Sequence, residues 1–511
     1  MTATKQGLIV VVLRRGLEAL VLGALFMLAF RFPATSGWGF LEAAMAFLFP
    51  ALLFDAVFKG RHQGWLYLAF FAGFAMLFHW VPATLEVKGP LPPVVALLAA
   101  LLLAGWESLG FLGVTLFARG AYRRSGPWAA AAAAAFGIAA WEVLGFHVYP
   151  WNWGAALGGL PWLARSAAFV GAHGLSAWCW GCGALFAALL ASAAPAKRIL
   201  KVPAAWLVLP VVLSLGWFLL PRNPERRLDV VMVQPNFEPG QRAPGMEQAM
   251  WARTDAILAE QRLPHAGVPT LVLWPESSVL GRDDRSPSLR LQDEALKRRV
   301  AWLYGTEGGA FNLVRGEVEG RGAFLQGKVE PMPFGERMPG PKAVRQWLET
   351  QLHLYSQEPG TLTRASSFSM LTPQGELRIH PLICSEALMP MRLAQGLALA
   401  GGDLLTNHTN DGWFEKSIAT DLHGAQIRLR AVEAGVPMLR ATLTGKSGLF
   451  RADGSWELWG EPRTEGAYAF SMAWRPRWTP ARSPWLIWAL LVGLGGTTLV
   501  MLKKKQPSQS I

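Results

Sequence analysis

Residues 377–386 read Leu-Arg-Ile-His-Pro-Leu-Ile-Cys-Ser-Glu, an apolar run that stops at a cysteine and is followed by two polar residues. Short apolar runs bounded by turn residues are typical of buried β-strands, so this stretch predicts a strand that delivers Cys384 at its end. The same pattern occurs earlier in the chain at 228–236 and at 270–277, where the second run presents Glu276.

Helical stretches are expected between and after these strands, at 246–262, 390–400 and 421–434. Strands that alternate with helices predict a layered α/β domain, which we expect to extend from 228 to 478. The active groups of such a domain come from strand ends and the loops that follow them.

The rest of the chain has a different composition. Of the 511 residues 52% are hydrophobic and only 16% are charged, whereas soluble domains carry about a quarter charged residues. Disorder and a wholly soluble enzyme are therefore both disfavoured. Three cysteines exclude a disulfide scaffold and a cysteine-rich zinc module, and we expect neither a metal nor a cofactor.

A membrane-spanning helix needs roughly 20 mostly apolar residues, and the sequence contains about eight such stretches. They are expected near 11–30, 37–57, 64–81, 92–117, 127–148, 166–193, 203–220 and 483–502. The first lacks a convincing cleavage site and is expected to be a retained anchor. The predicted organisation is a membrane part at 1–227, the α/β domain at 228–478, and a last helix with a basic tail at 479–511.

The net charge of +13 is compatible with nucleic-acid binding or with basic loops on the cytoplasmic side of a membrane. Residues 228–478 hold 27 Lys and Arg against 28 Asp and Glu, whereas the remainder holds 21 against 7. The excess therefore belongs to the membrane part, and no nucleic-acid partner is expected. With a cytoplasmic N-terminus, the cytoplasmic side receives 14 Lys and Arg and the other side 7, which predicts a domain outside the cytoplasm.

Several ionisable side chains fall inside or beside the expected spans. They are Glu18, Glu42, Asp55, His79, Glu107, Glu142, His147 and His173. Such groups are costly in hydrocarbon and would suit a proton pathway, but pairing across helices and at helix ends is the favoured explanation. Cys179 and Cys182 have the spacing of a redox or metal motif, yet they lie in an expected span and are predicted to be packing residues.

Cys384 is the only cysteine of the 228–478 domain. By position alone it is equally compatible with a nucleophile and with a buried small residue. Residues 327–336 place Lys328 and Glu336 around a Pro and Gly turn, and residues 407–414 form a polar loop after a strand. Each segment alone is typical of a surface turn.

Taken together, Glu276, Lys328 and Cys384 supply what a thiol acyl-transfer site needs. A carboxylate accepts the thiol proton, a fixed cation stabilises the oxyanion, and sulfur forms a thioester.

Glu, Lys and Cys in this order at strand ends resemble the nitrilase (carbon-nitrogen hydrolase) superfamily. The membrane frame with that domain before its last helix is similar to the apolipoprotein N-acyltransferase family. The motifs that carry the resemblance are Leu273-Trp-Pro-Glu276, Lys328 to Glu336 with its Pro-Phe-Gly-Glu ending, Ile383-Cys-Ser-Glu386, Asn410-Asp-Gly-Trp-Phe414 and Gly435-Val-Pro-Met-Leu-Arg-Ala-Thr442. It implies about eight transmembrane helices and a four-layer αββα sandwich.

The resemblance implies Glu276, Lys328 and Cys384 as catalytic residues, with Glu336, Glu386 and Ser385 in supporting positions. Ser385 stands where the family commonly has Tyr. The apolar residues Met332, Phe334, Trp413 and Phe414 are candidate lid or lipid contacts, and core packing is an equal alternative for them.

The activity implied is transfer of an acyl chain from a phospholipid, phosphatidylethanolamine, to the N-terminal diacylglyceryl-cysteine of apolipoproteins. The implied location is the bacterial cytoplasmic (inner) membrane, with a monomer whose catalytic domain faces the periplasm. Two alternatives stay open: a membrane-tethered nitrilase-type amidase, and a transporter with an accessory domain, which would leave Glu276, Lys328 and Cys384 without a purpose.

Overall fold

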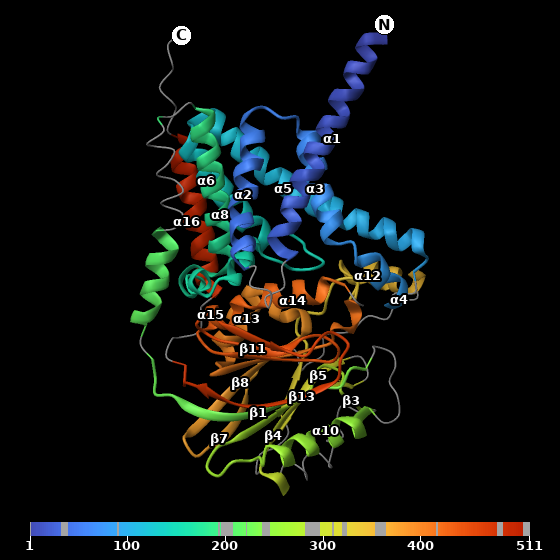
Figure 1. Cartoon of the computed structure of the whole chain (residues 1–511), viewed down its shortest axis with the longest axis vertical. Helices are drawn as coiled ribbons and strands as arrows, with labels where there is room; N and C mark the ends of the chain where they lie inside the picture. Colours follow the sequence, from blue (N-terminus) through green and yellow to red (C-terminus); the bar gives the residue numbers. More distant parts are fainter. Residues whose placement is uncertain are drawn as a thin grey trace.

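The computed structural model describes residues 2–31, 39–88, 91–192, 195, 208–220, 222–237, 246–281, 297–308, 311–318, 324–352, 364–414, 417–477 and 484–503. Long helices form one half of the molecule and two β-sheets with their covering helices form the other (Figure 1). The start of α1 and the end of α16 both lie at the end of the helical half that is remote from the sheets.

The helical half is built mainly from the first part of the chain. Its helices are α1 (Thr2–Arg31), α2 (Gly39–Phe58), α3 (Gln63–Leu77), α4 (Val81–Lys88), α5 (Pro93–Ser125), α6 (Pro127–Leu144), η1 (Trp153–Gly159), α7 (Pro161–Ala164), α8 (Ala167–Ala191), the apolar helix Val208–Leu219 with its last turn η2 (Trp217–Leu219), and α16 (Pro484–Lys503).

Five of the described helices are long and apolar enough to cross a membrane, namely α2, α5, α6, α8 and Leu486–Lys503 of α16. A sixth results if α3 and α4 form one bent span, so the expected number of about eight is not confirmed. Helix α1 does not meet the criterion, because Arg14, Arg15 and Glu18 interrupt its apolar sequence. The expected segment 203–220 lies partly outside the described residues.

The span expected near 64–81 consists of two helices joined at a break. Helix α3 ends at Leu77, and α4 begins at Val81 after a bend of 48°. Pro82 explains the break, since it has no N–H to continue the helical ladder and its ring clashes with the carbonyl four residues earlier.

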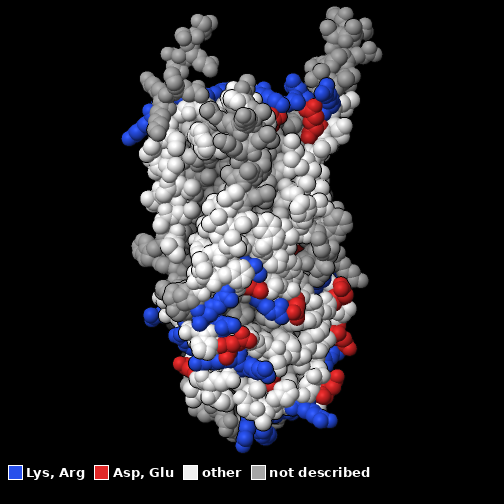
Figure 2. All heavy atoms as spheres, turned by 60° about the vertical axis from the view of Figure 1, so that its left-hand side comes forward, with Lys and Arg blue, Asp and Glu red and all other residues white. Residues whose placement is uncertain are grey.

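Charged side chains mark the ends of the helical half. Figure 2 shows Lys, Arg, Asp and Glu spread over the sheet-containing half, a broad band with almost none over the helices, and mostly Lys and Arg at the opposite rim. Such a band is typical of a surface that faces hydrocarbon.

The first sheet has seven strands in the order β13-β1-β2-β4-β5-β6, with β3 paired to β4. Its strands are β1 (Arg226–Gln234), β2 (Thr270–Leu273), β3 (Val279–Gly281), β4 (Ala301–Gly308), β5 (Phe311–Glu317), β6 (Phe324–Gly327) and β13 (Gly466–Trp474).

The second sheet has six strands in the order β12-β11-β10-β9-β8-β7. Its strands are β7 (Phe368–Thr372), β8 (Gly375–Ile383), β9 (Leu404–Thr409), β10 (Met438–Thr442), β11 (Ser447–Phe450) and β12 (Trp456–Trp459).

The two sheets pack face to face between two layers of helices. In β1, Leu228, Val230 and Met232 contact the second sheet, while Val231 and Val233 point to α10 (Met246–Glu260), as the period of two in a strand requires. The other face of the second sheet carries α13 (Pro390–Ala400), α14 (Ala419–Ile427) and α15 (Leu429–Ala434). The expected four-layer αββα sandwich is thus confirmed.

Further short elements lie around the edge of the sandwich: α12 (Lys342–Leu352), η3 (Cys384–Leu388) and η4 (Asp411–Phe414).

The last helical layer of the sandwich is buried directly against the membrane helices. One continuous apolar cluster extends from Phe26 of α1 to Leu397 of α13. Three polar contacts join the two halves. Arg428 pairs with Glu42 at 2.7 Å. The backbone amide of Ala172 donates to the Glu433 carboxylate at 2.7 Å, and the backbone amide of Asn152 donates to the Gln426 side chain at 2.8 Å. The two halves are therefore held in one orientation.

Seven of the eight ionisable side chains named for the expected spans are paired, as the favoured explanation predicted, and the eighth, His79, is exposed and contacts the Met76 carbonyl at 2.9 Å. Glu18 binds Arg61, Asp55 binds Lys59, and carboxylates also meet His147 and His173. Cys179 is buried among apolar side chains of α8 and its neighbours.

The Glu42–Arg428 pair gives a test of the junction. We expect Glu42→Leu or Arg428→Met alone to destabilise the protein by about 3 to 5 kcal/mol, because each leaves one buried charge without its counterion. The double variant should be destabilised by about 1 to 3 kcal/mol less than the sum of the two single-variant losses. Thermal unfolding in detergent measures these changes.

The matched control is Glu225→Gln, which breaks the exposed pair between Glu225 and Arg475. It should cost at most about 1 kcal/mol. If the loss of unfolding free energy in the double variant equals the sum of the losses in Glu42→Leu and Arg428→Met, the assigned pairing is contradicted.

Candidate active site

Glu276 sits in a tight turn after β2. The turn packs onto β4, where the Gly305 amide donates to the Pro275 carbonyl at 3.0 Å. A Cβ at Gly305 would come within 2.4 Å of the Glu276 Cα, so only glycine fits there. Glu276 is 3% exposed, and the side-chain amide of Asn312 donates a hydrogen bond to its carboxylate.

Lys328 follows β6 directly, and its backbone amide donates to the Asn312 carbonyl at 2.9 Å. Its ammonium donates to Glu336 Oε1 at 2.7 Å. The second oxygen of Glu336 accepts from the Met332 amide at 2.6 Å. Glu336 therefore holds both the ammonium and the turn that surrounds it.

Cys384 directly follows β8 and begins η3 with φ of +50°. This left-handed conformation is unfavourable for a residue with a Cβ, and such strain is concentrated at functional sites. Glu386 supports the turn, accepting from the Ile383 amide at 2.9 Å and from the Val329 amide at 2.7 Å. Glu386 thus ties the cysteine turn to the lysine loop.

The structure brings Glu276, Lys328 and Cys384 together, although they come from two different sheets. The Cys384 thiol lies close enough to the Glu276 carboxylate to interact with it electrostatically, and the Lys328 ammonium interacts electrostatically with both groups. A carboxylate, a cation and a thiol therefore share one buried space.

Burial dominates the ionisation of this site. It raises the pKa of Glu276 to about 7, against the opposing effect of Lys328. Burial and the nearby Glu276 charge raise the pKa of the Cys384 thiol to about 12. Burial lowers the pKa of Lys328, but Glu336, Cys384 and Glu276 outweigh it, so the net shift is upward. At neutral pH the cysteine is a thiol beside a base, and Lys328 is a permanent cation.

A buried polar network lies behind Cys384. Asn407 donates to the Cys384 carbonyl at 3.1 Å and accepts from Arg440 at 2.7 Å. Arg440 also donates to Asp411 at 2.6 Å, and His423 contacts the same carboxylate. Burial raises the pKa of Asp411, but Arg440 and His423 more than offset it and lower this pKa to about 2.

The four candidate lid residues differ in exposure. Phe334 is 50% exposed and Trp413 is 36% exposed, whereas Phe414 is buried and Met332 is partly buried against the core. Phe414 therefore forms a fixed wall. The Phe334 ring lies 6.4 Å from that of Phe146 in the loop after α6.

Ser385 is buried, and its hydroxyl has no hydrogen-bond partner among the described residues. It does not join the contacts that Glu336 and Glu386 make. Sequence reasoning missed Asn312, which lies in none of the quoted motifs. It included Arg440 only as part of the Gly435–Thr442 motif, without a role at the site.

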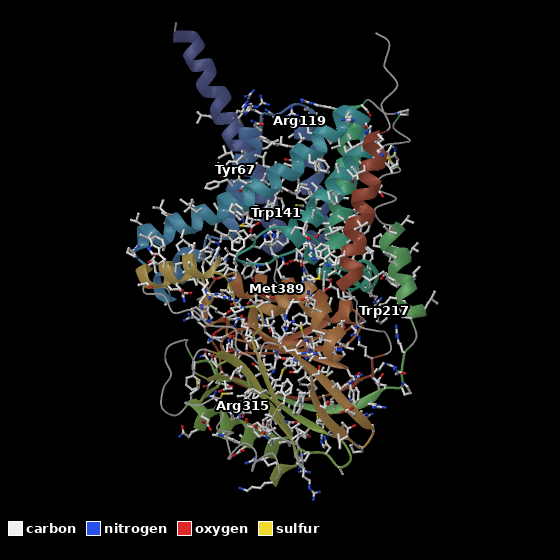
Figure 3. All side chains as sticks on the ribbon, turned by 180° about the vertical axis from the view of Figure 1, so that it is seen from behind. Tyr67, Arg119, Trp141, Trp217, Arg315 and Met389 are labelled. Atoms are coloured by element: carbon white, nitrogen blue, oxygen red, sulfur yellow. The ribbon has the colours of Figure 1, made fainter. Side chains whose placement is uncertain are left out.

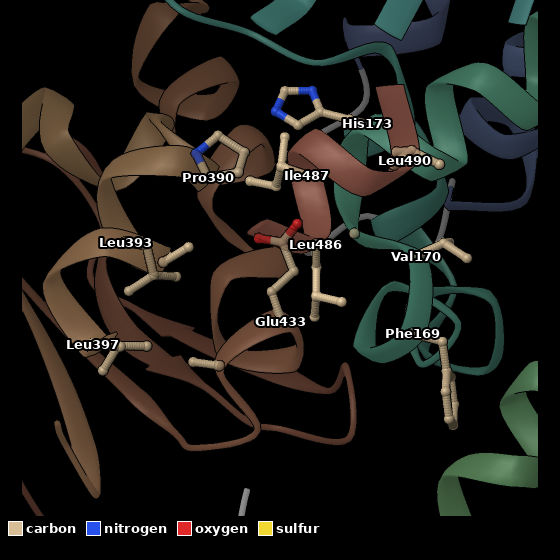
Figure 4. A pocket seen from close by; sticks show the side chains of 13 residues that line it. Phe169, Val170, His173, Pro390, Leu393, Leu397, Glu433, Leu486, Ile487 and Leu490 are labelled. Atoms are coloured by element: carbon tan, nitrogen blue, oxygen red, sulfur yellow. The ribbon is translucent and has the colours of Figure 1, made fainter. Parts of the chain in front are cut away.

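Within the described ranges, no group of three His, Cys, Asp or Glu side chains is placed to hold a metal ion. A cavity of about 150 Å³ lies apart from this site, at the junction of α8, α13, α15 and α16 (Figure 4). It is mainly apolar, with His173 and Glu433 among its lining residues, and none of the candidate active-site residues lines it.

Comparison with known proteins places this site in a family. The carbon-nitrogen hydrolase family model matches residues 339–481, which include Cys384. The chain is 30% identical over 420 residues to the apolipoprotein N-acyltransferase of Sinorhizobium fredii, covering 76% of this chain and 73% of that protein. The chain belongs to the apolipoprotein N-acyltransferase family.

Other apolipoprotein N-acyltransferases are similar over a shorter length. Those of Allorhizobium ampelinum and Rhizobium meliloti are each 30% identical to this chain and align with 64% of it. The alignments span 63% and 64% of those two relatives.

The raised pKa of Glu276 predicts the pH dependence of this apolipoprotein N-acyltransferase family member. If Glu276 is the base that deprotonates Cys384, the rate at which this thiol is acylated should fall as the pH drops below about 7, because a general base works only when it is ionised. The rate of acyl-enzyme formation, followed between about pH 5 and about pH 9, measures this limb. A limb near the ordinary glutamate pKa of about 4.3 would contradict the assignment.

Glu336→Gln serves as a charge control, because the Glu336 charge raises the pKa of Glu276. Removing this charge should lower the pH below which the rate falls.

The buried pair of Arg440 and Asp411 allows a separate test, which concerns the stability of the protein. Arg440→Met leaves Asp411 buried without its main cation and should cost about 3 to 5 kcal/mol in the free energy of unfolding. The control Arg451→Met breaks the more exposed pair with Glu457 and should cost no more than about 1 kcal/mol. Equal losses of unfolding free energy in the two variants, measured by thermal unfolding, would show that the buried network stabilises the protein no more than the exposed pair does.

Proposed function

We propose that this protein transfers an acyl chain from a membrane phospholipid, phosphatidylethanolamine, to the α-amino group of the N-terminal diacylglyceryl-cysteine of apolipoproteins. The observation that carries the proposal is the meeting of Glu276, Lys328 and Cys384 next to the membrane helices. The names of the relatives support the class of acceptor.

In the first half-reaction, Glu276 accepts the Cys384 proton as sulfur attacks the carbonyl carbon of the lipid ester. A C–S bond forms, and the Lys328 ammonium stabilises the negative oxygen of the tetrahedral adduct. The C–O bond then breaks, and Glu276 returns the proton to the departing alkoxy oxygen. The products are a lysophospholipid and a thioester on Cys384.

In the second half-reaction, the acceptor amine attacks the thioester carbonyl and Glu276 takes a proton from the nitrogen. The C–S bond breaks, and the sulfur leaves and is reprotonated. The product is an amide, and Cys384 is again a thiol. A covalent intermediate of this kind predicts ping-pong kinetics.

The position of the site suits lipid substrates. Withdrawing an acyl chain from the bilayer costs about 0.8 kcal/mol per CH₂ group, so the reacting carbonyl has to meet the thiol at the membrane. Phe414 of the cysteine-side loop touches Trp80, and Phe334 of the lysine loop lies beside Phe146. Both loops of the site therefore border the membrane part.

We also propose that the sandwich lies on the periplasmic side of the bacterial cytoplasmic membrane. The support is the excess of Lys and Arg on the predicted cytoplasmic loops. The basic rim opposite the sandwich agrees with this orientation (Figure 2).

The test is intact mass spectrometry of the full chain after incubation with phosphatidylethanolamine vesicles. Wild type should gain the mass of one acyl group and lose it when a diacylated lipopeptide with a free amine is added. Cys384→Ser should show no such thioester adduct, because a serine hydroxyl beside the same base is a much weaker nucleophile than a thiol.

Cys182→Ser is the matched control, because Cys182 lies in α8 and is not one of the site residues. It should be acylated like wild type. Release of ammonia from small amides without any lipid adduct would favour an amidase and overturn the proposed transfer.

A further inference from the structure

Tyr149 lies in the loop between α6 and η1, where the membrane part meets the site. It is 5% exposed. Its ring packs edge-on against Trp80, at 5.9 Å between centroids, and against Phe414, at 6.4 Å. Phe414 and Trp80 are themselves 5.1 Å apart, so the three rings form one aromatic cluster.

Two hydrogen-bond donors of this cluster have no acceptor. The Tyr149 hydroxyl and the Trp80 Nε1–H are both buried, and neither has a partner within the described part of the chain. Buried tyrosine and tryptophan donors are usually hydrogen-bonded, because leaving them unpaired is costly. Both donors are therefore available to an acceptor that the described residues do not supply, such as a water molecule or a substrate oxygen.

The cluster lies against the loop that holds Cys384. Phe414 is the last residue of η4, which follows β9, and Asn407 of β9 donates to the Cys384 carbonyl. The Tyr149 hydroxyl is close enough to interact electrostatically with Cys384 and Asp411. Glu276 and Lys328 approach the thiol from the sandwich, whereas Tyr149 approaches it from the membrane part.

We propose that the Tyr149 hydroxyl donates a hydrogen bond to the alkoxy oxygen of the lipid ester that acylates Cys384. This inference rests on the proposed function. Lys328 already serves the carbonyl oxygen, and negative charge develops on the alkoxy oxygen as the C–O bond breaks. A donor at that oxygen therefore becomes more effective in the transition state. Tyr149 makes and breaks no covalent bond; it positions and stabilises the leaving group.

The test compares both half-reactions in Tyr149→Phe, which keeps the ring and removes only the hydroxyl. With phosphatidylethanolamine vesicles, formation of the acyl-enzyme should slow about tenfold, as expected for one lost hydrogen bond of this kind. Transfer from preformed acyl-enzyme to a diacylated lipopeptide amine should change less than about threefold, because no alkoxy oxygen is present in that step. The melting temperature and the position of the acidic pH limb should stay as in wild type.

Tyr122→Phe is the matched control. Tyr122 contacts Phe58 near the end of α5 that carries Arg119, which Figure 3 places at the far end of the helices. This variant should match wild type in both half-reactions.

The outcomes separate this inference from the proposed function. Unchanged acylation in Tyr149→Phe, or equal slowing of both half-reactions, overturns the role of Tyr149 while wild type still forms its thioester. Failure of wild type to form any adduct on Cys384 overturns the proposed function itself, and with it this inference.

Discussion

The site depends on one constraint, the burial of a carboxylate, an ammonium and a thiol in the same space. Burial raises the pKa of Glu276 to about 7, so the carboxylate is a stronger base than an exposed glutamate and still ionises near neutral pH. Lys328 keeps its charge because Glu336 binds it at 2.7 Å. Each of the three groups would be less suited to its task in water, where charge interactions are weak.

Much of the surrounding structure maintains this burial. Glu386 joins the loops of Cys384 and Lys328 through backbone amides, and Gly305 allows the Glu276 turn to lie directly on β4. The helices α13, α14 and α15 cover the second sheet on one side and contact the membrane helices on the other. The helical layer that completes the sandwich is therefore also the layer that sets its position on the membrane part.

Local patterns predicted the elements well where one physical signal dominated. The strands that present Glu276 and Cys384 were predictable from apolar runs stopped by turn residues, and the helix at 390–400 was predicted with its observed bounds. The bend within the span expected near 64–81 was not predicted, because hydrophobicity alone does not register the effect of Pro82 on the backbone. Buried partners such as Asn312 and Arg440 could not be predicted, since their contacts join residues distant in sequence.

The sequence by itself determined the fold class, the apolar frame and the three reactive residue types, because periodicity, composition and short motifs are local properties. Only the tertiary structure decided that Glu276, Lys328 and Cys384 meet, since they follow strands of two different sheets. It also decided that Tyr149 and Trp80 of the membrane part border the site. That neighbourhood depends on how the sandwich packs against the membrane helices, and pairs such as Glu42 and Arg428, 386 residues apart, are invisible to any local pattern.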